Sequence, residues 1–299
     1  MLNRMKLKAY AKINLGLDVL RKREDGYHEV RMIMQTVGIY DRICLTKQQE
    51  AGIRIRTNLY FLPTDAENIV YRAARLMMEE YQIKGGIEIE LQKYIPIAAG
   101  LAGGSSDAAA VLYGINRMYQ LGLSLEELME QGIKLGADVP YCLMRGTALS
   151  EGIGEKLKSL SAAPDAWVLM AKPPVSVSTK FVYENLDVEK LERHPDIDGM
   201  ITAIENGNLY QLADQMGNVL ETVTIPNYPV VAKIKEQIRQ SGALNVLMSG
   251  SGPTVFGLFD CRERAERGYE ALKKAEISRQ VYITKFYQPN HRRKTAEEV

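Results

Sequence analysis

A run of small residues in the first half of the chain has the composition of an anion-binding loop. Pro96–Ala110 holds three glycines and two serines within seven residues, and apolar residues then follow at helical spacing over Asp107–Tyr119. Ser106 is the expected N-cap, and Asp107 lies in the expected first turn, where a carboxylate suits the positive helix end. Such a loop points several backbone N–H groups at one place, which suits a phosphate. The alternative is an ordinary flexible loop, but the glycines cluster at the cap.

A second run of small residues, Met248–Thr254, lies between two predicted strands. It is either a tight hairpin or a turn whose glycines, Gly250 and Gly252 around Ser251, let the backbone approach a ligand. No Gly-Lys-Ser/Thr follows the first run, as a Walker motif requires, and neither run has Gly-x-Gly-x-x-Gly spacing. The spacing therefore disfavours a dehydrogenase and requires a different phosphate-binding architecture.

Two charged residues outside the glycine runs could act on a phosphoryl group. Phosphoryl transfer needs a cation near the transferring group and a residue that orients or deprotonates the attacking hydroxyl. Lys12 shares a predicted strand face with Asn14, and Asp138 opens a predicted short helix. Each has a simpler alternative, a solvated strand face for Lys12 and an N-cap for Asp138.

The histidines show no triad or zinc spacing, which disfavours Ser-His-Asp hydrolysis and metallohydrolysis. They are His28, His194 and His291. The cysteines also have no metal-ligand spacing, and their odd number favours a reducing compartment. They are Cys44, Cys142 and Cys261.

Composition limits the class of protein further. The 299 residues are 46% apolar and 25% charged, which suits a folded chain of one or two domains. The net charge of +1 argues against a broad nucleic-acid surface. The sequence has no apolar run of roughly 18 residues, as a membrane span needs, and no signal-peptide core. We therefore expect a cytoplasmic protein that is not associated with a membrane.

The first half of the chain predicts strands and helices that carry the glycine loop. Asp25–Gly26 predicts a hairpin turn, a capping box at Thr64 predicts a helix to about residue 81, and Ser124 opens another helix. The predicted strands are 6–20, 27–37, 42–47, 52–57 and 86–92.

The second half predicts a separate domain. Small residues and proline at 159–164 mark a boundary between domains at 1–160 and 161–287, and a polar tail follows at 288–299. Helices beside strands joined by a hairpin indicate an α+β domain of the ferredoxin-like type. The predicted strands are 166–171, 243–248, 254–259 and 281–286, and the predicted helices are 179–185, 197–205, 209–219, 230–241 and 263–275.

Three segments together resemble the motifs of the GHMP kinases, the galactose, homoserine, mevalonate and phosphomevalonate kinase family. They are Ala9–Leu15, Pro96–Ala110 and Met248–Thr254. The resemblance implies a two-domain α+β architecture, the first domain like domain 2 of ribosomal protein S5 and the second ferredoxin-like, with the site between them. Ala98, Ala99 and Ala102 stand where many members have glycine. Alanine still admits close backbone approach there unless its φ is positive.

The resemblance also implies roles for the polar residues. Asp138 would act as base toward the substrate hydroxyl, and Lys12 would polarise that hydroxyl with Asn14 beside it. The glycine loop would hold the phosphates of ATP, with Mg2+ bridging them and its protein ligands unknown. The implied ATP-binding residues are Pro96, Ile97, Ala98, Ala99, Gly100, Leu101, Ala102, Gly103, Gly104, Ser105, Ser106, Asp107, Asn68 and Lys93.

One branch of this family is similar to this chain at Ala11–Leu15, Asp25–Glu29 and Gly136–Pro140. Its substrate is 2-C-methyl-D-erythritol linked to cytidine diphosphate, in the non-mevalonate isoprenoid route, and ATP phosphorylates the 2-hydroxyl. The resemblance implies that Tyr27 and His28 hold the cytosine and that Tyr183 stacks on its other face. A flat pyrimidine suits an aromatic platform, and an imidazole can bind its polar edge. The other predicted substrate-binding residues are Gly250, Ser251 and Gly252.

Two other classes of protein stay open. Another GHMP kinase, acting on a mevalonate-like or sugar substrate or as an ATP-dependent decarboxylase, would have no cytosine for Tyr27 and His28. A non-catalytic, RNA-binding module of S5-like fold is disfavoured by the net charge and by the joint presence of Lys12 and Asp138. For Tyr27 and Tyr183, simple packing is the alternative. We expect a monomer or homodimer with a small-molecule substrate and no nucleic-acid partner.

Overall fold

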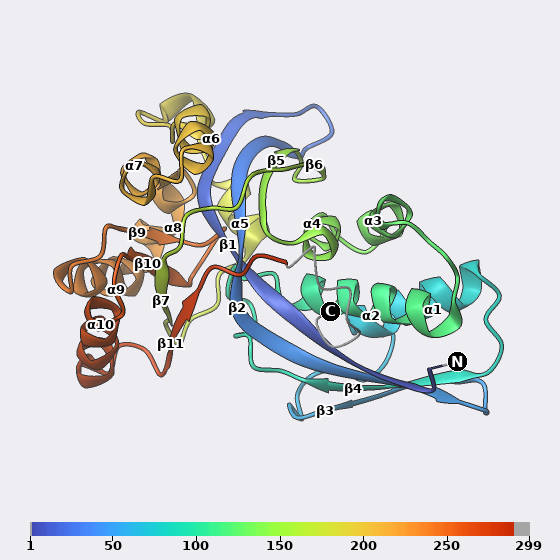
Figure 1. Cartoon of the computed structure of the whole chain (residues 1–299). Coiled ribbons are helices and arrows are strands. Elements are labelled where there is room, and N and C mark those ends of the chain that lie inside the picture. The colour runs from blue at the N-terminus through green and yellow to red at the C-terminus, as the bar shows by residue number, and fades with distance from the viewer. Residues whose placement is uncertain (1, 290–299) are drawn as a thin grey trace.

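The computed structural model describes residues 2–289, which form two β-sheets with their own helices (Figure 1). The larger sheet has seven strands; its main order is β3-β4-β2-β1-β8, β5 pairs with β2, and β6 pairs with β5. Its strands are β1 (Arg4–Lys22), β2 (His28–Gln48), β3 (Gly52–Thr57), β4 (Gly86–Gln92), β5 (Thr147–Gly152), β6 (Lys156–Ser159) and β8 (Gly217–Asn218).

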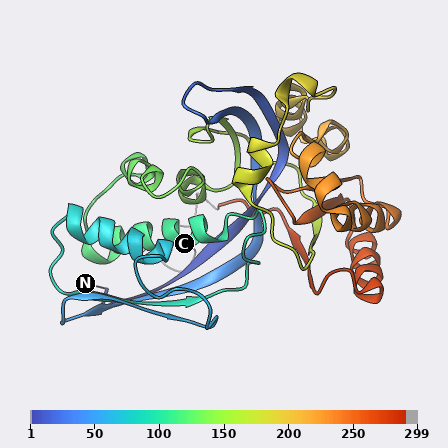
Figure 2. The same ribbon diagram turned by 180° about the vertical axis from the view of Figure 1, so that it is seen from behind.

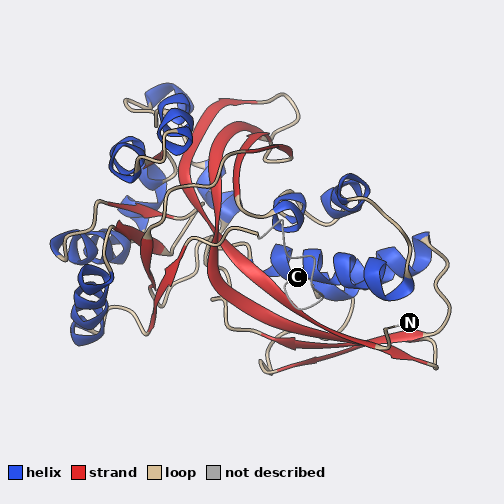
Figure 3. Cartoon of the chain, in the orientation of Figure 1, coloured by secondary structure: helices blue, strands red, loops and turns tan. Residues whose placement is uncertain are grey.

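β1 and β2 form a long antiparallel hairpin through the middle of the molecule (Figure 3). The predicted turn at Asp25–Gly26 is confirmed, and Gly26 adopts φ +85°, which favours glycine. The prediction of separate strands at 27–37 and 42–47 is wrong, because β2 runs through both without a break.

The pairing of β1 with β2 is irregular between Tyr10 and Lys12 and again between Asn14 and Gly16. Such bulges bend a strand and redirect its side chains. Lys12 is only 5% exposed and Asn14 is fully buried. The alternative of a solvated strand face for Lys12 is therefore wrong.

Four helices lie on one face of the larger sheet, and α2 packs against β1 and β2 (Figure 2). They are α1 (Ile69–Glu80), α2 (Gly103–Tyr119), α3 (Leu125–Ile133) and α4 (Val139–Met144). The predicted start at Ser124 is confirmed, with a capping box between Ser124 and Glu127. The capping box predicted at Thr64 is wrong, because Asn68 caps α1 by accepting a hydrogen bond from the Val70 N–H at 3.1 Å.

The smaller sheet has four antiparallel strands in the order β11-β7-β10-β9, which is the ferredoxin-like order. They are β7 (Trp167–Lys172), β9 (Asn245–Met248), β10 (Val255–Phe259) and β11 (Gln280–Lys285). The other helices are α5 (Thr179–Glu184), the 3-10 helix η1 (Val188–Lys190), α6 (Ile197–Glu205), α7 (Leu209–Gln215), α8 (Glu221–Asn227), α9 (Pro229–Gln240) and α10 (Arg262–Ala275). The predicted helix over 209–219 is too long, since α7 ends before β8.

The two sheets share a hydrophobic core. Ile13 and Leu15 of β1 belong to one buried cluster with Met200 of α6 and Phe256 of β10. The predicted boundary at 159–164 lies between β6 and β7, yet β8 from the second half pairs with β1. The exact division into domains stays a prediction, and the shared core fixes the two halves against each other.

The chain after β11 returns to the larger sheet. Tyr287 N–H donates to the Thr36 carbonyl at 2.9 Å, and the Gln288 side chain donates to Thr147 Oγ1 at 2.8 Å. The predicted tail therefore begins with defined contacts, and its residues 290–299, with His291, lie outside the described residues. Within residues 2–289, every helix is too short or too polar to cross a membrane.

Candidate active site

A cavity of about 1090 Å³ lies between the two halves and is lined by both. Single small-molecule sites usually occupy about 300–1,000 Å³, so this cavity is at the large end for one site. The predicted site residues that line it are Lys12, Asn14, Tyr27, His28, Asn68, Lys93, Pro96, Ile97, Ala98, Ala99, Gly100, Leu101, Ala102, Gly103, Gly104, Ser105, Asp107, Asp138, Tyr183, Gly250 and Ser251. Ser106 and Gly252 do not line it: Ser106 is buried on another side of α2, and Gly252 shapes the turn at φ +88°.

Lys12 of β1 contacts Asn14 on the same strand and Asp138 at the start of α4. Its Nζ donates to Asn14 Oδ1 at 2.8 Å and lies 3.6 Å from Asp138 Oδ2. Its backbone N–H donates to the Leu101 carbonyl at 3.1 Å, which fixes the glycine loop to the same strand. A cation and a carboxylate thus face one point of the cavity beside the loop.

Asp138 occupies the N-cap position of α4 but does not cap it. Its side chain makes no capping hydrogen bond, and Pro140 near the start of α4 removes one N–H that would need a partner. The carboxylate is 34% exposed and pairs with Lys12. A structural capping role for Asp138 is therefore wrong, and the carboxylate is available to a ligand.

The glycine loop turns through several left-handed residues before α2. Ala98 adopts φ +50°, Gly100 φ +73° and Ala102 φ +54°. Ala98 and Ala102 therefore have the positive φ at which alanine is strained, and each left-handed alanine costs roughly 1–2 kcal/mol. Strain of this kind is typical of ligand sites.

The helix α2 begins earlier than its sequence indicates. Its N-cap is Ala102, which offers no side-chain hydrogen bond, so Ser106 is not the N-cap and Asp107 is not in the first turn. The first N–H groups of α2, from Gly103 onward, therefore have no side-chain cap beside the cavity. An uncapped helix N-terminus binds an anion through its N–H groups and its dipole.

The second glycine run packs directly on the first. Ser249 Oγ donates to the Gly100 carbonyl at 2.9 Å, and a Cβ at Gly100 would lie 2.2 Å from the Ser249 carbonyl oxygen. Asn218 of β8 holds the turn by donating to the carbonyls of Met248 and Gly250, each at 2.8 Å. Glycine is therefore required at position 100 by contact between the two loops, which pack together as one wall of the cavity.

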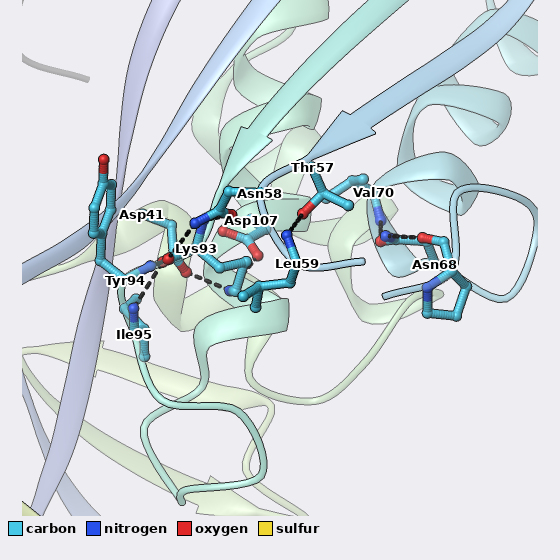
Figure 4. A network of polar contacts seen from close by, with 11 residues as sticks. Asp41, Thr57, Asn58, Leu59, Asn68, Val70, Lys93, Tyr94, Ile95 and Asp107 are labelled. Atoms are coloured by element: carbon cyan, nitrogen blue, oxygen red, sulfur yellow. Dashed lines mark hydrogen bonds and ion pairs between the residues drawn. The ribbon is translucent and has the colours of Figure 1, made fainter. Parts of the chain in front are cut away.

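Lys93 lies between two carboxylates at the root of the glycine loop (Figure 4). Its Nζ donates to Asp41 and, at 2.6 Å, to Asp107 Oδ2. All three side chains are buried. Burial opposes the charge of Lys93, but Asp107 and Asp41 outweigh it and raise the pKa of the ammonium. Lys93 therefore ties β2 and α2 to the root of the loop.

Asp107 carries an oxygen that the fold leaves unsatisfied. Burial raises the pKa of Asp107 well above its usual range, Lys93 opposes that shift, and Asp41 adds to it. Its Oδ1 is buried without a hydrogen-bond partner, and the residue lines the cavity. A buried unpaired acceptor is costly, so this oxygen suits a donor or a cation that arrives with a ligand.

The hairpin end of the cavity presents an imidazole and two aromatic rings. The centroids of the His28 and Tyr183 rings lie 5.2 Å apart at an interplanar angle of 39°. Tyr27 is 61% exposed, which is not the burial of a packed tyrosine, whereas His28 is buried. Burial, and then the charge of Lys22, lower the pKa of His28. A neutral imidazole has one donor and one acceptor nitrogen.

Several functional residues were not predicted. Asp41 and Asn58 do not line the cavity but contact Lys93 (Figure 4). The one signal for Asp41 in the sequence is an acidic residue within an extended run. The sequence gives no signal for Asn58, since an asparagine after a strand is typical of an ordinary turn. The unpredicted polar and wall residues of the cavity include Lys22, Leu62, Pro63, Glu67, Ala137, Thr179, Lys180 and Glu184.

Comparison with known families gives the class that this fold and site define. The profile of the GHMP kinases N terminal domain matches residues 68–146, and that of the GHMP kinases C terminal matches residues 200–277. A homoserine kinase from Cytophaga hutchinsonii has the same fold, with a TM-score of 0.77 over 95% of this chain at 23% identity. The chain belongs to the GHMP kinases, and the two-domain α+β fold predicted from the sequence is confirmed.

Closer relatives narrow the family to one branch. The 4-diphosphocytidyl-2-C-methyl-D-erythritol kinase of Lachnospira eligens is 55% identical over 95% of this chain and 99% of its own length. That of Caldicellulosiruptor bescii is 53% identical over 90% of this chain and 94% of its own. A crystal structure of 4-(cytidine 5'-diphospho)-2C-methyl-D-erythritol kinase superposes with a TM-score of 0.82 at 33% identity, covering 95% and 100% of the two chains. Within the GHMP kinases, the chain belongs to the 4-diphosphocytidyl-2-C-methyl-D-erythritol kinases.

Proposed function

We propose that the chain transfers the γ-phosphoryl group of ATP to the 2-hydroxyl of 4-diphosphocytidyl-2-C-methyl-D-erythritol, giving the 2-phosphate and ADP. The names of relatives that match nearly the full length support this substrate. One structural observation carries the proposal. The Lys12–Asp138 pair lies in a single cavity with an uncapped helix N-terminus and with the Tyr27–His28 hairpin.

The product belongs to the non-mevalonate route to isoprenoid precursors, and we place the reaction in the cytoplasm. The three cysteines are free in the structure, two of them buried. Unpaired cysteines are typical of a reducing compartment.

In this proposal Asp138 accepts the proton and Lys12 stabilises the negative charge. The substrate 2-hydroxyl oxygen attacks the γ-phosphorus while its proton passes to the Asp138 carboxylate, and the bond from phosphorus to the ADP oxygen breaks. Lys12, held by Asn14, places its ammonium against the oxygen that loses the proton and against the transferring group. Positioning and electrostatics supply most of the rate in this chemistry.

The glycine loop would hold the triphosphate at the start of α2. Within residues 2–289, no three or more His, Cys, Asp or Glu side chains gather as a metal site. Mg2+ in such enzymes is commonly held by phosphates and water with one or two carboxylates, so it needs few ligands from the protein. The unpartnered Asp107 Oδ1 is a protein oxygen that fits it. Bound Mg2+ would neutralise charge on the phosphates.

Cytosine recognition can be tested with cytidine diphosphate as a competitor of the substrate in an assay of ADP release. We expect competition in the wild type and a loss of roughly tenfold or more in competitor affinity in His28→Ala and Tyr27→Ala, because stacking and edge contacts are removed. The KM for ATP should not change. Tyr210→Ala is the control, since Tyr210 is 63% exposed and lies outside the cavity. If cytidine diphosphate did not compete with the wild type, the cytosine assignment would be wrong.

The affinity for cytidine should depend on pH through His28. The pKa of His28 lies below its usual 6.5, so the imidazole is mostly neutral at pH 6.5 and becomes protonated as the pH falls further. Protonation replaces the acceptor nitrogen with a donor and places a charge in a buried site. We expect constant affinity above pH 6.5 and weaker binding below it, measured by calorimetry with cytidine, which has no phosphate to titrate. A His28→Gln variant that kept the same pH dependence would contradict this assignment.

A further inference from the structure

The glycine loop is attached to the larger sheet through residues 93–95, which leave β4 and lead into the loop (Figure 4). Side chains from distant positions in the sequence form hydrogen bonds with the backbone groups of this segment. Asp41 Oδ1 accepts from the N–H groups of Tyr94 and Ile95, the second at 2.8 Å. Lys93 is held by Asn58, which lies outside the cavity.

Asn58 binds Lys93 as a neighbouring strand would. Its Oδ1 accepts from the Lys93 N–H at 2.8 Å, and its Nδ2 donates to the Lys93 carbonyl at 3.1 Å. The paired part of β3 ends with Thr57 beside Leu91. The Asn58 amide therefore continues the pairing of β4 beyond the point where the backbone ladder stops.

Asn58 also joins two walls of the cavity. It begins the connection from β3 to α1, in which Leu62, Pro63 and Asn68 line the cavity. On the other side, Lys93 reaches Asp107 of α2, and the loop between them forms the second wall. One amide side chain thus links the two walls at the glycine-loop end, in addition to the packing of α1 on α2.

We infer that Asn58 is a positioning residue for the nucleotide. It does not touch the ligand, but it holds the root of the phosphate-binding loop against the opposite wall before ATP arrives. A preorganised loop binds more tightly because less ordering is left for the binding step. This inference rests on the proposed assignment of ATP to the glycine loop.

The test compares Asn58→Ala with Asn116→Ala in the full-length chain. Asn116 makes the same pair of bonds with the backbone of Leu123, at 2.9 and 3.1 Å, and lies outside the cavity. We expect the KM for ATP to rise about five- to tenfold in Asn58→Ala only, with kcat and the KM for the alcohol substrate within about twofold of wild type. Melting temperatures should fall by roughly 2–6 °C in both variants.

The control separates positioning from stability. Asn116 is only 7% exposed, whereas Asn58 is exposed, so an effect caused by destabilisation alone would be larger in Asn116→Ala. Asn58→Asp, which keeps the acceptor for the Lys93 N–H, should give an intermediate KM for ATP. An unchanged KM for ATP in Asn58→Ala, or an equal rise in both alanine variants, overturns the inference. A wild type that ATP does not saturate overturns the proposed function itself.

Discussion

Replacing Asp138 by asparagine is expected to lower kcat by roughly 10²–10⁴-fold, with little change in either KM. Asparagine keeps the shape of the side chain but cannot accept the hydroxyl proton, and general bases contribute about this factor. The effect should appear equally in kcat and kcat/KM, because the lost interaction exists only in the transition state. Release of ADP from ATP and 4-diphosphocytidyl-2-C-methyl-D-erythritol is the measurement.

The fold makes this a clean substitution. Asp138 makes no capping hydrogen bond, and its pair with Lys12 is long, at 3.6 Å, and partly exposed, so Asp138→Asn should change the melting temperature by only about a few degrees. Asp196 is the matched control, because it stands at the N-cap of α6 and does accept a hydrogen bond there, from the Gly199 N–H at 2.9 Å. Asparagine caps as well as aspartate, so Asp196→Asn should retain both stability and activity. Full turnover by Asp138→Asn would show that the base has been assigned wrongly.

The elements that carry Lys12, Asn14, Tyr27 and the glycine loop were predictable because their signals are local. Strand alternation places Lys12 and Asn14 on one face, Asp25–Gly26 predicts the hairpin before Tyr27, and clustered glycines mark the glycine loop. These signals depend on chemistry within a few residues. That Lys12, Asn14 and Tyr27 share one site was implied only by the family resemblance, and the structure places all three in one cavity.

The errors arise where distant residues decide the local structure. Ser106 and Asp107 look like a cap and a first turn, but α2 already starts at Gly103, after the left-handed Ala102. Asp107 is then free to pair with Lys93. β2 runs on through Asp41 because Lys93 and two backbone N–H groups meet that carboxylate. Those partners are more than 50 residues from Asp41 in the chain, and no local pattern encodes them.

Replacing Gly100 by alanine is expected to destabilise the chain by roughly 2–4 kcal/mol and to raise the KM for ATP more than tenfold. Gly100 has φ +73°, where a Cβ is strained, and its Cβ would lie 2.2 Å from the Ser249 carbonyl oxygen. Because the obstacle is backbone, no change of rotamer relieves it. Either the glycine loop or the turn at Ser249 must shift, and both belong to the cavity wall. Thermal unfolding without nucleotide and ATP titration measure the two effects.

Gly104 provides the control within the same loop. A Cβ at Gly104 would meet only Ile69 Cγ2, at 3.6 Å, which is ordinary van der Waals contact, and its φ is not in the left-handed region. It lies inside α2, where alanine is favoured over glycine by about 0.5–1 kcal/mol. Gly104→Ala should therefore unfold at or above the wild-type temperature. Equal stability of Gly100→Ala and Gly104→Ala would mean that the two glycine runs separate at little cost, and that contact with Ser249 does not set the loop conformation.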